Sequence, residues 1–215
     1  MTAEREEPSH PRAQAGSFAA YFAISGLISL ALWILLLLPN FLQSRGWSSQ
    51  RIGWAMGTYF ITNLVVQIFA GHLADRFGNL RTALWGTAIG CVAGCVYVVA
   101  FWAPGLIFAA RLLHAAAAAL ISAGVLIELI GSVPPDLRGR MIGYYGLPGF
   151  VMLGAGPMLS EWFVFRWGFP GTFTAVAAIF VAVALILARL PASAAAPFRP
   201  SASATPPARS RPVSA

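Results

Sequence analysis

Six apolar runs divide this 215-residue chain, and each is about as long as a bilayer is thick. A hydrocarbon core of about 30 Å needs roughly 20 apolar residues in a helix. The six runs are Phe18 to Leu38, Ile52 to Ala70, Thr82 to Trp102, Gly105 to Ile130, Met141 to Leu159 and Phe169 to Leu190. The pattern predicts an all-α integral membrane protein built as a six-transmembrane-helix bundle. The first run is predicted to be a retained helix, because it is too long for a signal peptide and no A-x-A cleavage site follows it.

The composition agrees with a membrane protein and argues against a nucleic-acid partner. The chain is 58% hydrophobic and 10% charged, whereas soluble domains are about a quarter charged. Its formal charge of +7 comes from 14 basic residues, all of them arginine. In so apolar a chain, arginines are expected at the membrane edges, where they face anionic headgroups. The predicted partner is therefore the lipid bilayer.

The distribution of the arginines predicts the topology. Ten arginines fall on the side of the amino terminus, three on the other side, and Arg111 lies within a span. By the positive-inside rule, both termini are predicted to be cytoplasmic in a multi-pass protein of the plasma (cell inner) membrane. Residues 1–17 are then a cytoplasmic tail and residues 18–190 the transmembrane domain. Residues 191–215 are rich in Ala, Pro and Arg and are predicted to be a disordered cytoplasmic tail.

Both internal loops between helices carry Asp and Arg together. The first follows Gly71 and contains Asp75, Arg76, Gly78 and Arg81, and the second has an Asp-x-Arg-x-Arg sequence at residues 136–140. Gly71 and Gly78 permit tight backbone approach and positive φ angles, which a loop that only anchors the topology does not require. Opposed charges at helix ends can pair across the cytoplasmic face. The alternative is that these loops only anchor the topology.

Four polar side chains inside the predicted spans are candidates for lining a cavity: Arg111, His114, Asn63 and Gln67. Arg111 comes seven residues after Pro104, about 10 Å into the membrane, where an arginine costs roughly 2.5 to 3.5 kcal/mol. Such a cost predicts a cavity or a partner, unless the side chain snorkels to the outer interface. His114 shares the Arg111 face, although a lone histidine can also be a packed core residue. Asn63 and Gln67 are four residues apart and form a polar stripe, which faces the same cavity or makes interhelical hydrogen bonds.

Further along, the fourth and fifth predicted helices carry polar and helix-breaking residues. Glu128 lies about 25 Å beyond Arg111 on the same helix, near the cytoplasmic loops, where it could also be an ordinary surface residue. Pro148 and Pro157 are predicted to kink the fifth helix, because proline removes backbone hydrogen bonds. In the third helix, glycines spaced by four allow close helix packing.

Four motifs in register resemble those of the major facilitator superfamily. They are Gly71-x-Leu73-Ala74-Asp75-Arg76-x-Gly78, Ile107-x-x-x-Arg111-x-x-His114-Ala115-x-Ala117, Pro135-Asp136-x-Arg138-Gly139-Arg140 and Gly156-Pro157. The resemblance covers Phe18 to about Leu190 and corresponds to the amino-terminal six-helix half of a family normally built from two halves. Where the last motif would continue with a Gly pair, this chain has Ser160 and Glu161.

The resemblance implies a fold, a function and a set of site residues. The six helices are expected to form two three-helix inverted repeats, and the protein to move a small-molecule solute by alternating access, with efflux as one direction. A gating charge network is implied for Gly71, Asp75, Arg76, Gly78, Arg81, Glu128 and Arg138. Substrate contact or proton coupling is implied for Arg111, His114, Asn63 and Gln67, and helix bending for Gly156 and Pro157.

The sequence offers no catalytic site. The three histidines lie in a tail, a loop and a span, so no metal-ligand cluster is expected. No Gly-rich loop with Gly-Lys-Ser/Thr occurs, so neither a cofactor nor a nucleotide is expected. The prediction is a secondary active transporter that works with a homodimer partner or a second transporter half. The alternative is a truncated fragment that does not transport, and that is inert or binds other membrane proteins.

Overall fold

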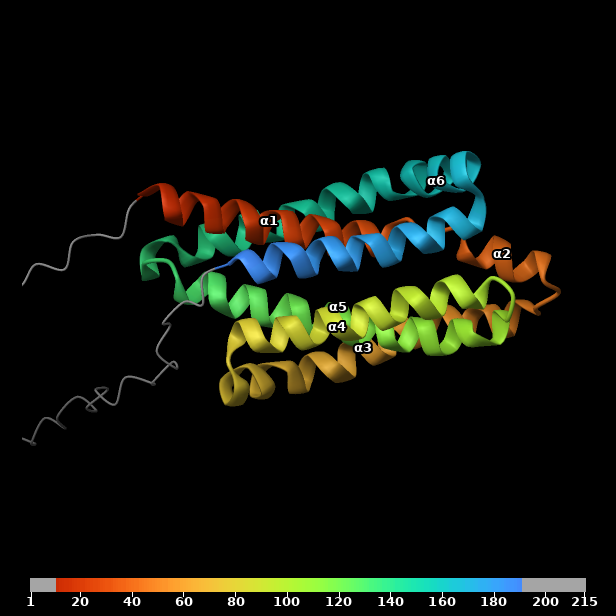
Figure 1. The fold of residues 1–215 in the computed structure, drawn as a ribbon, viewed down its shortest axis with the longest axis horizontal. Coiled ribbons are helices and arrows are strands. Elements are labelled where there is room, and N and C mark those ends of the chain that lie inside the picture. The colour runs from red at the N-terminus through yellow and green to blue at the C-terminus, as the bar shows by residue number, and fades with distance from the viewer. Residues whose placement is uncertain (1–10, 191–215) are drawn as a thin grey trace, which may run out of the picture.

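A computed structural model describes residues 11–190, with side chains from Ser17 onward. Residues 1–10, most of the first predicted tail, and residues 191–215, all of the second, lie outside the described residues. The described part consists of helices joined by short turns and has no strand (Figure 1). Its elements are α1 (Pro11–Trp33), α2 (Leu38–Ser44), α3 (Ser49–Phe77), α4 (Asn79–Ala100), η1 (Pro104–Leu106), α5 (Ile107–Gly131), η2 (Pro135–Leu137) and α6 (Arg138–Arg189).

Helix α6 is two helical limbs joined at one glycine. Its 52 residues would run about 78 Å if straight, more than twice the thickness of a bilayer core. Gly168 has φ 65° and ψ −176°, and the chain turns back there, so that residues 138–167 and 169–189 form separate limbs (Figure 1). Five stretches of the described chain are long and apolar enough to cross a membrane, and α6 falls in one of them. An all-helical membrane bundle is therefore confirmed, and six spans result when the two limbs are counted separately.

The first predicted span is interrupted, and Pro39 explains why. Helix α1 ends at Trp33, whereas the sequence predicted a continuous helix to Leu38. Proline has no N–H and its ring clashes with the carbonyl four residues earlier, which here belongs to Leu35. The chain instead tightens: the Leu35 N–H donates to the Leu32 carbonyl at 3.3 Å, and the next N–H bonds with the same three-residue spacing. Helix α2 then continues the span.

Small residues let the helices approach closely. Helix α5 packs against α3 and α4, and α4 also packs against α6, which in turn packs against α1. A Cβ added at Gly86 would lie 2.8 Å from the Leu120 side chain of α5. A Cβ at Gly94 would lie 2.5 Å from the Ala177 Cα of the second α6 limb. The glycines of the third predicted helix therefore serve packing within the chain.

The turn between α3 and α4 is a single residue, Gly78. Helix α3 continues through Phe77, seven residues beyond the predicted end at Ala70, because nothing in that stretch breaks a helix. Gly78 has φ 96°, a conformation that favours glycine. Gly71, the other motif glycine, does not use this freedom: it lies within α3, and an added Cβ would meet no atom within 4 Å.

Candidate functional site

Arg111 is buried in the second turn of α5. Only 1% of its surface is exposed, so it does not snorkel to the outer interface. Its Nη2 donates to the Met56 carbonyl oxygen of α3 at 3.3 Å. Its guanidinium carbon lies 4.7 Å from the centre of the Tyr59 ring, a cation–π distance. Nε and Nη1 have no hydrogen-bond partner among the described residues.

Arg111 borders a hollow that we call the central hollow. It has a volume of about 80 Å³ and lies where the α1–α2 break, α3 and α5 meet. Besides Arg111, its walls are formed by six apolar residues: Leu32, Trp33, Leu35, Leu36, Met56 and Phe60. The sequence predicted a cavity beside Arg111 but missed the α1 residues that close it. Pro39 was the available signal, because a proline there implies a broken helix just before it.

His114 lies among aromatic rings and does not line the central hollow. It is fully buried, and its Nδ1 lies 3.4 Å from the Tyr97 hydroxyl. The rings of Tyr59, Tyr97 and Phe180 meet it edge to face, with centroids 5.2 to 5.9 Å away. Its Nε2 has no partner in the described part of the chain. This is the geometry of a packed histidine held one turn below Arg111.

Asn63 and Gln67 take different environments. The Asn63 Nδ2 donates to the Ala115 carbonyl oxygen of α5 at 3.3 Å, which ties α3 to α5. Gln67 is exposed and makes no hydrogen bond within residues 17–190. Neither side chain lines the central hollow. In this conformation Asn63 therefore makes an interhelical hydrogen bond, which is one of the two roles that the sequence allowed.

The charged residues of the two internal loops gather at one end of the bundle. The α3–α4 turn and the segment after α5 lie together at the left of Figure 1. Glu128 is 3% exposed, and its Oε2 accepts a 3.0 Å hydrogen bond from the Asn79 Nδ2. Its Oε1 has no partner among the described residues. This bond joins the end of α5 to the start of α4, and the sequence analysis did not foresee it.

The other members of the predicted network are not ion-paired within the described residues. Asp75, Arg76 and Arg81 are exposed, and Arg76 lies over the ring of the adjacent Phe77 at 5.3 Å. Arg138 is half-buried, and its Nε has no partner in the described chain. The charge network stays a prediction for a different conformation of the protein.

The Gly-Pro pair lies where the first α6 limb contacts α1. A Cβ added at Gly156 would lie 2.8 Å from the Trp33 Cβ, so the glycine lets a wall of the central hollow pack on α6. Pro157 is exposed, and the one non-helical residue inside α6 is Gly168. The bending role of the pair therefore stays a prediction.

Ser160, one turn further along, holds the α1–α2 break. It is fully buried, its hydroxyl donates to the Ile34 carbonyl oxygen at 3.0 Å, and it accepts from the Leu37 N–H at 3.1 Å. The sequence signal for this role was that Ser160 stands where the Gly-Pro motif would have a glycine, which has no hydroxyl and could not make these bonds.

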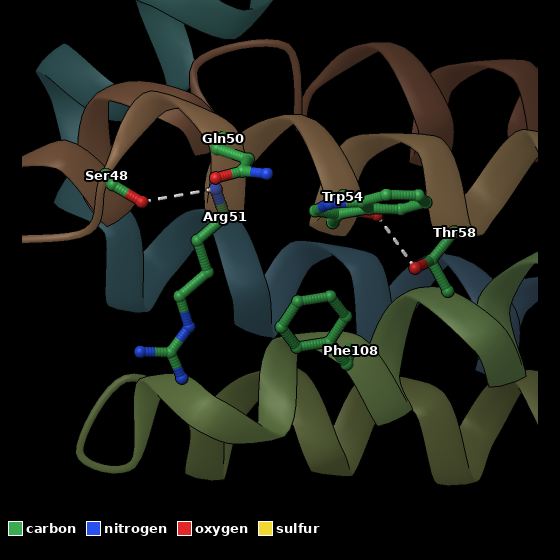
Figure 2. A pocket seen from close by; sticks show the side chains of 6 residues that line it. All are labelled: Ser48, Gln50, Arg51, Trp54, Thr58 and Phe108. Carbon is green, nitrogen blue, oxygen red and sulfur yellow. Dashed lines mark hydrogen bonds between the residues drawn. The ribbon is translucent and has the colours of Figure 1, made fainter.

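A second hollow, the outer groove, opens between the amino-terminal ends of α3 and α5. Its volume is about 390 Å³, and Figure 2 shows the six residues that line it: Ser48, Gln50, Arg51, Trp54, Thr58 and Phe108. Two lining hydroxyls are used locally: the Ser48 Oγ accepts from the Arg51 N–H, and the Thr58 hydroxyl donates to the Trp54 carbonyl. Most of these residues are exposed, so the groove is a surface feature. Residues 17–190 contain no group of three potential metal ligands.

Comparison with known proteins gives a family and several distant relatives. The profile of the Major Facilitator Superfamily matches residues 14–214. The chain is 30% identical to "Major facilitator superfamily multidrug transporter mfsC" of Aspergillus fumigatus, over 52% of this chain and 22% of that protein. It is 32% identical to "Methylenomycin A resistance protein" of Streptomyces coelicolor, over 57% of this chain and 26% of that protein. It is 28% identical to "Alpha-ketoglutarate permease" of Bacillus subtilis, over 56% of this chain and 31% of that protein. The chain thus spans less than a third of each relative.

Proposed function

The chain belongs to the major facilitator superfamily, and from that premise we propose that it moves a small solute across the membrane by alternating access. The observation that carries the proposal is Arg111, which is buried at the central hollow and has two nitrogens without a hydrogen-bond partner among the described residues. Burying a cation in a membrane costs free energy, and charged residues found there usually mark a functional site. Relatives named as a multidrug transporter, a resistance protein and a permease support transport, with efflux as one direction.

In this proposal the solute binds in the central hollow. Arg111 contacts it directly, and the apolar walls exclude water from the contact. His114 is packed against the aromatic side chains one turn below Arg111. In this proposal its imidazole is the group that takes up and releases the coupled proton, beside the fixed charge of Arg111. Asn63 and Gln67 lie along α3 and would meet the solute as it moves toward the cytoplasmic side.

The charged end of the bundle acts as the cytoplasmic gate. With both termini cytoplasmic and the protein in the plasma membrane, this end faces the cell interior. When the transporter faces outward, Arg76 and Arg138 pair with the carboxylates of Asp75 and Glu128 and latch the ends of α3 and α5. Gly78 supports this role, because a one-residue turn transmits a tilt of α3 directly to α4. Arg81 and Gly71 complete the network, and bending at Gly156 and Pro157 lets the first α6 limb follow.

A second set of helices completes the transport path. The outward faces of α3 and of residues 138–167 are apolar, with Phe60 62% exposed and Phe150 73% exposed. Lipid can cover such faces, but Phe60 also lines the central hollow, which is therefore incompletely walled by this chain. We propose that a second copy of the chain, or a separately encoded half, covers this side.

Reconstitution into liposomes tests the proposal. Purified chain is reconstituted at defined orientation, and uptake of a broad solute panel is measured with and without a proton gradient, together with the oligomeric state. We expect saturable uptake that Arg111→Ala abolishes and that Arg166→Ala, an exposed arginine of α6, leaves unchanged. A folded monomer that takes up no solute would contradict the transport role and favour the non-transporting fragment.

A further inference from the structure

We propose that the solute bound at the central hollow is an anion with an apolar body, and that its charged group pairs with Arg111. The inference rests on the transport role proposed above and adds the chemical class of the solute. It is carried by the charge balance of the buried core.

The first step is the unfilled hydrogen-bonding capacity of Arg111. A guanidinium has five N–H donors and cannot lose its charge in a protein. Nη2 donates to the Met56 carbonyl oxygen at 3.3 Å, while Nε and Nη1 have no hydrogen-bond partner in the described chain. With 1% of the residue exposed, solvent at the protein surface does not satisfy these donors. The site therefore presents a charged guanidinium in which Nε and Nη1 lack an acceptor among the described residues.

The second step is the absence of a counter-ion within residues 17–190. The acidic side chains there are Asp75, Glu128, Asp136 and Glu161. Glu128 lies about 25 Å further along α5 and is bonded to Asn79. The other three are exposed, and none forms an ion pair in the described residues. No described carboxylate neutralises Arg111, and the Met56 carbonyl and Tyr59 ring offer only partial negative charge.

The third step is the shape and lining of the central hollow. About 80 Å³ holds about three water molecules, which suits a carboxylate and the first carbons attached to it. A carboxylate can accept two parallel N–H bonds from a guanidinium. Trp33, Leu32 and Phe60 would contact the adjoining apolar part of the solute. Leu36 and Phe60 are both exposed at the rim, so a longer apolar tail could extend outward. A cation would be repelled, and a polyol would find no further polar side chain on these walls.

Matched probes of different charge test this class. The purified full chain in lipid nanodiscs is titrated with benzoate, benzamide and benzylamine, and with hexanoate, hexanamide and hexylamine. Binding is followed by tryptophan fluorescence, since Trp33 lines the hollow. We expect each anion to bind at least about tenfold more tightly than its amide, as for a charge-assisted hydrogen bond, and the amines not to bind. Arg111→Gln should abolish the preference, and Arg166→Gln should retain it.

A second variant keeps the test decisive if Arg111→Gln does not fold. Met56→Glu places a carboxylate on the wall of the hollow with Arg111 intact. It should fold with a melting temperature at least equal to that of the wild type, because an internal partner replaces the missing anion, and it should lose the anion preference. Equal binding of anions and amides by the wild type would overturn the inference. Binding of no probe would also overturn it and would favour a counter-ion from another polypeptide. Liposome uptake restricted to neutral or cationic solutes would overturn the anion class while leaving transport intact.

Discussion

Removing the Ser160 hydroxyl should loosen the wall of the central hollow. The hydroxyl donates to the Ile34 carbonyl oxygen at 3.0 Å and accepts from the Leu37 N–H at 3.1 Å, in a fully buried position. Ser160→Ala leaves one backbone acceptor and one backbone donor unpaired at the α1–α2 break. Unpaired buried groups cost about 1–3 kcal/mol each in proteins, whereas side-chain hydrogen bonds inside membranes average about 0.6 kcal/mol. Two bonds therefore predict a loss of about 2 kcal/mol in the free energy of unfolding.

The assay is equilibrium unfolding in mixed micelles, followed by tryptophan fluorescence and circular dichroism. Ser44→Ala is the matched control, because that exposed hydroxyl bonds only to the Phe41 carbonyl three residues earlier, at 2.8 Å. We expect the control to change the free energy of unfolding by less than about 0.5 kcal/mol. Equal, small effects of both substitutions would refute the reasoning and would mean that Pro39 alone maintains the break.

Two further substitution experiments test the packing and the charged end. Gly94→Ala should destabilise the protein by about 1–3 kcal/mol in the same unfolding assay, because the new Cβ would lie 2.5 Å from the Ala177 Cα. Gly154→Ala is the control and should not destabilise the protein, because no neighbouring atom lies within 4 Å of the new Cβ. Similar effects of the two glycine substitutions would contradict the proposed close packing of α4 on α6. A double-mutant cycle of Asn79→Ala and Glu128→Ala should give a coupling free energy of about 0.6 to 1.7 kcal/mol for their 3.0 Å hydrogen bond. Additive single effects would indicate that water replaces this bond.

The fold was predictable because the apolar runs obey a length rule that does not depend on tertiary detail. The helical spans and the membrane class follow from about 20 apolar residues per crossing. The cavity beside Arg111 was also predictable, because an arginine inside a membrane span costs free energy and therefore indicates a cavity or a partner. What failed were local backbone details. The helix through Gly71 was not expected, because glycine permits a turn without requiring one.

The partners of the site residues were not predictable from one sequence. Met56 contacts Arg111 through its backbone carbonyl, which every residue type carries, so no sequence signal marks it. Asn79 bonds to Glu128 from a helix that begins 49 residues earlier in the chain, and the pairing depends on how α4 and α5 pack. Ser160 differs, because its departure from a glycine position was visible, but its two backbone partners depend on the break at Pro39.

Helix α5 connects the two parts of the site. It carries Arg111 near one end and Glu128 near the other, and each is almost fully buried with at least one polar atom unpartnered in the described chain. Between them, Gly124 of α5 lies against the Asn79 backbone of α4, and Gly86 of α4 lies against Ala117 of α5, and neither glycine has room for a side chain. Because such packing resists bending, α5 and α4 should move as one body. A change in the charge beside Arg111 that tilts α5 would then displace Glu128 as well, which is the physical requirement for a gate that responds to solute.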